Sequence, residues 1–81
     1  MDFSKMTWAG DFRPRNPKLV LQAGSKVIIS FESTFMGREY FCIRDIYDRY
    51  GEWAPGKGGI QVPLERKQDL LDGLSALMVT A

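Results

Sequence analysis

The hydrophobic positions of the chain change their period near Pro63. Before that residue, short runs rich in β-branched and aromatic residues are separated by glycines, which is typical of strands joined by turns. After it, leucine and methionine residues recur at the spacing of one helix face. The pattern therefore predicts an α+β fold in which strands come first and one helix closes the chain.

Four strands are expected, and the loops between them contain glycine. The strands are predicted over Lys18–Ala23, Lys26–Phe35, Arg38–Asp48 and Glu52–Val62. Met36-Gly37 makes a two-residue hairpin loop, because Gly37 accepts the positive φ that such a turn needs. Pro55 cannot donate a hydrogen bond within a ladder, so the last strand is expected to be interrupted at Pro55-Gly56, at an edge, a bulge or a bend.

Residues 1–17 are predicted to be an N-terminal arm ahead of a domain formed by residues 18–81. Gly10, Pro14 and Pro17 interrupt any sustained period in this stretch. The arm is therefore expected to be irregular, with one short strand around Phe3 to Trp8.

The closing helix is predicted over Pro63 to Val79. Pro63 suits a first helical turn, and Glu65 favours the positive end of the helix dipole. The apolar stripe of this helix consists of Leu70, Leu71, Leu74, Leu77 and Met78.

The apolar surface of the predicted sheet is larger than one helix can cover. Four strands spaced at about 4.8 Å make a sheet about 19 Å wide, whereas a helix is about 10 Å across. Both faces of the central hairpin carry apolar residues, so a monomer would expose a large apolar patch. We therefore expect a homodimer with the five stripe residues at its interface.

The stretch Gly51–Gly58, GEWAPGKG, nearly matches the phosphate-binding loop G-x-x-x-x-G-K-[ST]. Gly58 stands where a Ser or Thr hydroxyl would ligate Mg²⁺. Ile60-Gln61-Val62 then predicts a strand where the motif needs a helix, and 81 residues leave no room for the parallel sheet around it. The stretch is expected to be a kinked strand connection without a triphosphate site.

Composition offers little for catalysis. The net charge is only +1, from 11 basic and 10 acidic residues, and there is no histidine to serve as general base or metal ligand. The single cysteine, Cys42, lies in the apolar run Tyr40-Phe41-Cys42-Ile43 and has no histidine to activate it, so it is expected to be a buried structural thiol. Asp45 and Asp48 would point to opposite faces of a strand, which favours solvated or paired carboxylates over a metal site. We expect no enzyme activity, no cofactor, no metal and no membrane segment, and an intracellular protein.

Three segments together resemble a known family. They are Phe35-Met36-Gly37-Arg38, Ile43-Arg44-Asp45-Ile46-Tyr47 and Pro55-Gly56-Lys57-Gly58-Gly59-Ile60. Their order and spacing are similar to those in the C-terminal domain of the transcriptional coactivator positive cofactor four and its bacterial and phage relatives. The resemblance runs from about Lys26 to Leu77. It implies a dimeric, curved antiparallel sheet that binds single-stranded DNA, or melted duplex, without strong sequence preference, with the helices at the dimer interface.

The resemblance also implies which residues contact DNA. Phe35 and Tyr47 would stack on bases, and the phosphate contacts would be Lys26, Arg38, Arg44 and Lys57. Other roles stay open, because Phe35 could pack across strands, Arg44 could pair with an acidic neighbour and Lys57 could simply be solvated. Strict alternation puts Arg44 and Tyr47 on opposite faces, so both serve one groove only if the strand bulges or twists.

The chain departs from the family pattern at several positions. Tyr47 stands where the family has Trp, and basic positions of the family hold Ser33, Met36, Ala54 and Gly58. Fewer cations predict weaker and less salt-sensitive binding. The residues that are candidates to compensate for the missing cations are Trp8, Trp53, Arg13, Arg15 and Lys18.

The Ser- and acid-rich regulatory region of the animal coactivator is not seen in this sequence. We therefore expect a prokaryotic or phage protein that handles single strands in replication, recombination or transcription, located in the nucleoid or an infected host cell, or in the nucleus if the source is eukaryotic. The alternative, favoured by the near-neutral charge, is a dimeric protein-interaction module on a polymerase or replisome.

Overall fold

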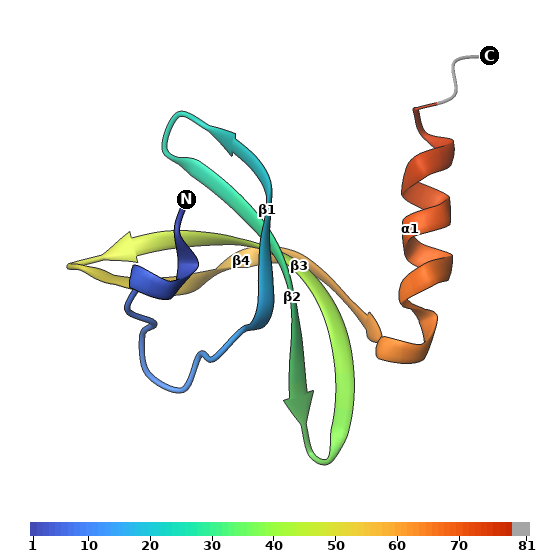
Figure 1. The fold of residues 1–81 in the computed structure, drawn as a ribbon, viewed down its shortest axis with the longest axis horizontal. Coiled ribbons are helices and arrows are strands. Elements are labelled where there is room, and N and C mark those ends of the chain that lie inside the picture. Colours follow the sequence, from blue (N-terminus) through green and yellow to red (C-terminus); the bar gives the residue numbers. More distant parts are fainter. Residues whose placement is uncertain (79–81) are drawn as a thin grey trace.

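The computed structural model describes residues 1–78 and shows one antiparallel sheet with a helix beside it (Figure 1). The four strands follow one another across the sheet in chain order: β1 (Arg15–Ala23), β2 (Lys26–Phe35), β3 (Arg38–Arg49) and β4 (Glu52–Pro63). The sheet is strongly curved, and the helical elements are η1 (Phe3–Lys5), η2 (Leu64–Arg66) and α1 (Lys67–Ala76). The predicted α+β architecture, with a curved four-stranded sheet and one C-terminal helix, is confirmed.

The hairpin loops form where the sequence predicts them. Met36 and Gly37 join β2 to β3 with φ values of 52° and 79°, and Tyr50 and Gly51 join β3 to β4 with φ values of 55° and 90°. Two successive positive φ values match the right-handed twist of the flanking strands, so these tight loops keep the strands paired.

Two predicted elements have different bounds in the structure. The strand expected around Phe3 to Trp8 is wrong, because Phe3–Lys5 is a 3₁₀ helix and only Trp8 makes a bridge, a parallel one to Trp53. Asp2 caps η1 by accepting hydrogen bonds from the Ser4 hydroxyl and amide, which lower the pKa of Asp2. The following strand, β1, begins at Arg15 and not at Lys18.

The helix also begins later than predicted. Pro63 is extended (φ −54°, ψ 141°) and pairs with Tyr40 as the last residue of β4, so the α-helix starts only at Lys67, after η2. Proline fits this place because a strand end on the sheet edge needs no donor. The helix ends at Ala76, and the predicted terminal residue Val79 lies outside the described residues.

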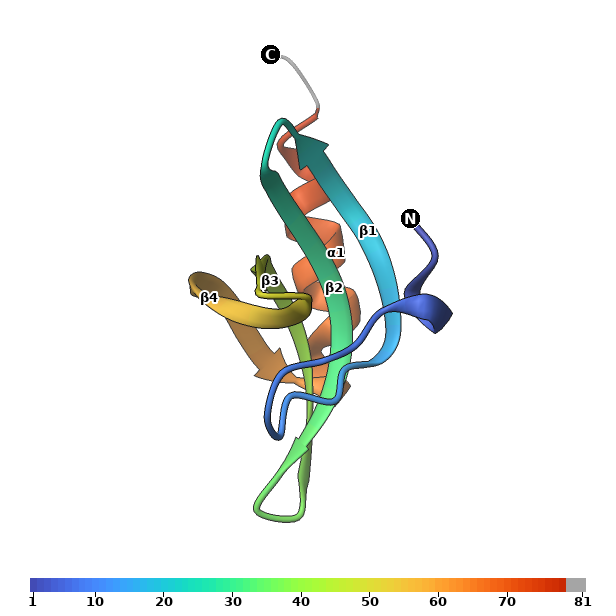
Figure 2. The ribbon, with the colours of Figure 1, turned by 90° about the vertical axis from the view of Figure 1, so that its left-hand side faces the viewer.

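The N-terminal arm covers one face of the sheet, here called the core face, whose buried residues are Val27, Ile29, Phe31, Cys42 and Ile46. The Phe12 ring lies edge-on to the Phe31 ring at 5.3 Å and to the Trp8 ring at 5.4 Å. The Ala9 amide donates to the Trp53 carbonyl at 2.9 Å, which ties the arm to β4. Figure 2 shows the arm crossing in front of the sheet. Cys42 is buried, as predicted.

The opposite face, here called the helix face, carries Ile28, Phe41, Ile43, Ile60 and Val62 by strand register. The first turn of α1 contacts it, because the Lys67 ammonium lies 5.1 Å from the centre of the buried Phe41 ring. The rest of α1 stands away from the sheet (Figure 1); Leu74 in α1 is 37% exposed, and Leu77, which follows the helix, is 79% exposed. Within residues 1–78, no helix is long and apolar enough to cross a membrane.

Candidate nucleic-acid interface

The tip of the β2–β3 hairpin presents an aromatic ring next to a guanidinium. Phe35 and Arg38 are register partners on either side of the Met36–Gly37 turn, so their side chains project from the same sheet face. By alternation this is the core face, but the arm does not bury the tip, and Phe35 is 62% exposed. The ring is therefore available to a partner, since so large an exposed fraction leaves little cross-strand packing.

A β-bulge distorts β4 between Pro55 and Gly59. Opposite it, β3 advances two residues, from Arg44 to Ile46, while β4 covers four, so the two strands lose register there. The bulge explains how Pro55 is tolerated, because β4 is an edge strand and Pro55 still faces Ile46. The predicted kinked connection is thus confirmed, and strand β4 continues through Ile60 to Pro63 where a phosphate-binding loop would start a helix.

Two adjacent β3 side chains hold this bulge. The Arg44 guanidinium donates from Nη1 to the Gly56 carbonyl at 3.1 Å, and the Gly58 amide donates to Asp45 Oδ1 at 3.2 Å. Neighbouring residues on a strand point to opposite faces, so the bulge is bonded from both sides. Lys57 lies between the two bonded glycines and is exposed.

Close contacts with β3 explain two of the glycines. A Cβ at Gly56 would overlap the Asp45 carboxylate, and one at Gly59 would lie 2.8 Å from the Ile43 carbonyl oxygen. At Gly58 the nearest atom would be 3.6 Å away, an ordinary contact. Glycine is therefore required at position 59 by the backbone of β3, whereas a Cβ at position 56 would displace only the end of the Asp45 side chain and position 58 has room for a methyl group.

Two further predicted contacts, Lys26 and Tyr47, are exposed on the face of β2 and β3 opposite to Phe35 and Arg38. Lys26 precedes the buried Val27, and Tyr47 follows the buried Ile46, so alternation places both on the helix face. Lys26 lines a shallow groove that is otherwise formed by Ile28, Ile43, Arg44, Asp45, Gly58, Gly59 and Ile60. Tyr47 is 46% exposed and pairs with Ala54.

The structure thus divides the six predicted contacts into two groups. Phe35 and Arg38 lie at the hairpin tip, while Lys26, Arg44, Tyr47 and Lys57 lie around the bulge at the far half of the same strands. The ten residues from Lys26 to Phe35 span roughly 30 Å along β2. Because the bulge is in β4, the alternation of side chains along β3 is intact, and Arg44 and Tyr47 lie on opposite faces of that strand. Both can contact one ligand only if the ligand wraps around the twisted strand.

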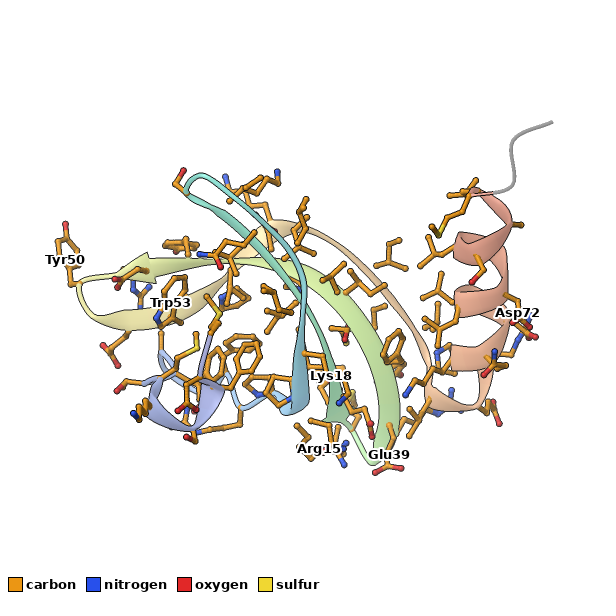
Figure 3. The ribbon with its side chains drawn as sticks, turned by 45° about the horizontal axis from the view of Figure 1, so that its top comes forward. Arg15, Lys18, Glu39, Tyr50, Trp53 and Asp72 are labelled. Carbon is orange, nitrogen blue, oxygen red and sulfur yellow. The ribbon has the colours of Figure 1, made fainter. Side chains whose placement is uncertain are left out.

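Two residues at this end of the sheet have roles that the sequence did not indicate. Asp45 bonds the bulge, as described above. Tyr50 is fully exposed in the β3–β4 turn and projects from the end of the hairpin (Figure 3). Tyr50 directly precedes the turn residue Gly51, and an aromatic residue in a turn is a sequence signal that marks it as a third stacking candidate.

The arm cations are engaged within the protein. Arg13 donates to the carbonyls of Gly10 and Phe12, and Arg15 donates to Thr34 and pairs with Glu39 at 3.2 Å. Figure 3 shows Arg15, Lys18 and Glu39 gathered near the β2–β3 tip.

Asp45 and Asp48 each accept a backbone amide. Asp48 accepts the Gly51 amide at 2.8 Å and so holds the β3–β4 turn, while Asp45 holds the bulge. Within residues 1–78 there is no cluster of three or more His, Cys, Asp or Glu side chains able to hold a metal ion.

A family model matches the chain. The family model described as Transcriptional Coactivator p15 (PC4) matches residues 22–73, more than half of the chain. The match includes all of β2, β3 and β4 and the first part of α1, and therefore both groups of predicted contacts. No curated protein and no solved structure matches.

Proposed function

Because the chain belongs to the Transcriptional Coactivator p15 (PC4) family, we propose that it binds single-stranded DNA, or melted duplex, as a homodimer without strong sequence preference. Membership in the family supports nucleic-acid binding and a coactivator-like role. The protein acts by binding and not by catalysis in this proposal, and it serves transcription, replication or recombination in a bacterial or phage setting.

The observation that carries the proposal is the exposure of aromatic rings next to cations. Phe35 is the register partner of Arg38, and Tyr47 shares the helix face with Lys26, near the bulge that exposes Lys57. Proteins that bind single strands use this combination, with rings stacking on bases and cations following the backbone. The rings of Phe12 and Phe31, by contrast, pack against each other inside the core.

The exposed apolar surface supports the homodimer. Leu74, Leu77 and Met78 of the helix stripe are exposed in the single chain, and so are Leu21 and Ile60 of the sheet. An apolar surface of this kind marks a contact site. A second copy would cover it, because each copy offers the same helix stripe to the other in a two-fold arrangement.

Titration of labelled oligo-dT, followed by fluorescence anisotropy, tests the function. If four to six cations of a dimer contact phosphates, log K should fall against log salt with a slope of about −3 to −4, at roughly 0.7 per contact. Duplex of equal length should bind more weakly, because its bases are not free to stack. Preference for the duplex, or no binding of either, would contradict the proposal.

The second candidate is a dimeric protein-interaction module recruited to a polymerase or replisome. The net charge of +1 favours it, because such a charge does not concentrate nucleic acid around the protein. A dimer that binds neither oligo-dT nor duplex at low salt would support this candidate over the first.

A further inference from the structure

Asp45 brings a negative charge to a surface that is proposed to contact phosphates. Its carboxylate lies on the helix face, where it lines the same groove as Lys26 and repels an anion. The adjacent Arg44 and the nearby Lys57 are both proposed phosphate contacts. A carboxylate at this position therefore opposes binding unless it has another task.

The contacts of Asp45 indicate that task. Oδ1 accepts the Gly58 amide at 3.2 Å, and the carboxylate lies so close to Gly56 that a Cβ there would overlap it. Arg44 bonds the Gly56 carbonyl from the other side of the strand. The residues on both sides of Lys57 are thus tied to β3, although a segment with glycines at 56, 58 and 59 would otherwise have great backbone freedom.

We propose that Asp45 is a positioning residue that fixes the β4 bulge and thereby presents Lys57 to the phosphates of a bound single strand. The inference rests on the proposed function. Ordering the bulge before binding removes an entropy cost that the complex would otherwise bear, and it holds the Lys57 ammonium toward the ligand. The gain from this order exceeds the repulsion between the carboxylate and the phosphates.

The charge and the hydrogen bond of Asp45 can be separated by mutation. Asp45→Asn keeps an acceptor oxygen of the same shape but removes the negative charge, so oligo-dT affinity should equal or exceed that of the wild type. Asp45→Ala removes both the charge and the acceptor, and oligo-dT affinity should fall several-fold. The salt slope should decrease by somewhat under one unit per site, because one phosphate contact is lost. Adding Lys57→Ala to Asp45→Ala should then have little further effect.

Asp48→Ala is the matched control. Asp48 lies on the same strand and also accepts a glycine amide, but it holds the β3–β4 turn and not the bulge. Its removal should leave the salt slope unchanged. Protection of the Gly58 amide from hydrogen exchange reports the bulge without DNA: it should persist in Asp45→Asn and be lost in Asp45→Ala.

The outcomes distinguish this inference from the function on which it rests. A wild-type protein that does not bind oligo-dT overturns the proposed function, and this inference falls with it. If the wild type binds normally, two results would overturn the inference but not the function. One is that Asp45→Ala binds as tightly as Asp45→Asn. The other is that the effects of Asp45→Ala and Lys57→Ala on affinity are additive. Should Asp45→Ala unfold, loss of salt slope in Asp45→Asn would be the contradicting result.

Discussion

Phe35 and Arg38 face each other as the last register pair of β2 and β3, across the turn of Met36 and Gly37. The Phe35 ring is mostly exposed, although Arg15 of the arm bonds Thr34 and Glu39 on either side of this pair. The two side chains offer different interactions to a nucleic acid, stacking and charge, and the two can be measured apart.

Replacing Phe35 or Tyr47 by alanine should weaken oligo-dT binding by about 1–3 kcal/mol per ring, because a stacking surface is lost. The salt slope should hardly change, since no cation is removed. Arg38→Ala should show the converse, a flatter slope, at roughly 0.7 per contact. If both aromatic variants fold and bind like the wild type, the rings have no stacking role.

Lys57→Ala should weaken oligo-dT binding and reduce the salt slope, because the exposed ammonium at the bulge no longer meets a phosphate. The melting temperature should not respond to millimolar ATP and Mg²⁺ in either the wild type or the variant, because β4 continues as a strand after Gly58. ATP-dependent stabilisation of the wild type that disappears in Lys57→Ala would instead establish a nucleotide loop.

Leu74→Asp should dissociate the proposed dimer, since an unpaired charge buried in an interface costs roughly 3–5 kcal/mol. Light scattering with mass determination measures the change. Ala76→Asp is the control, because two residues farther along α1 the same charge points about 200° away from Leu74. A monomeric wild type, or a Leu74→Asp dimer as stable as the Ala76→Asp one, would contradict a helix-mediated dimer.

Gly59→Ala should destabilise the fold by about 1–3 kcal/mol, because the new methyl group meets the Ile43 carbonyl of the paired strand at 2.8 Å. Gly58→Ala, one residue away, should leave the free energy of unfolding unchanged within about 0.5 kcal/mol, since its methyl group has room. Urea denaturation compares the two. Equal stabilities would mean that the bulge does not lie against β3 as described.

Phe12→Ala should lower the free energy of unfolding by about 2–3 kcal/mol, less than for a fully buried ring because Phe12 is half-buried. It removes edge contacts with both Trp8 and Phe31. Phe35→Ala, which truncates an exposed ring of the same size, is the control and should cost under about 1 kcal/mol. An arm that is dispensable for stability would show no difference between these variants.

The sequence by itself determined the parts of the fold that depend on neighbouring residues. Alternating β-branched and aromatic residues defined β2 and β3, and the positive φ required after Met36 could be assigned to Gly37. The change from period two to helical spacing predicted α1 as a helix, since a helix stripe is a local property. The family resemblance was equally visible, because its motifs are short segments in a set order.

Contacts between distant residues were decided only by the tertiary structure. Pro63 favours a helix start when read locally, but its pairing with Tyr40 keeps it in β4. The arm shows no period, yet Trp8 and Phe12 cover the core face because the sheet leaves that face otherwise open. The part that Asp45 plays at Gly56 and Gly58 was hidden for the same reason: eleven and thirteen positions separate the residues along the chain, and only strand pairing brings the carboxylate to the bulge.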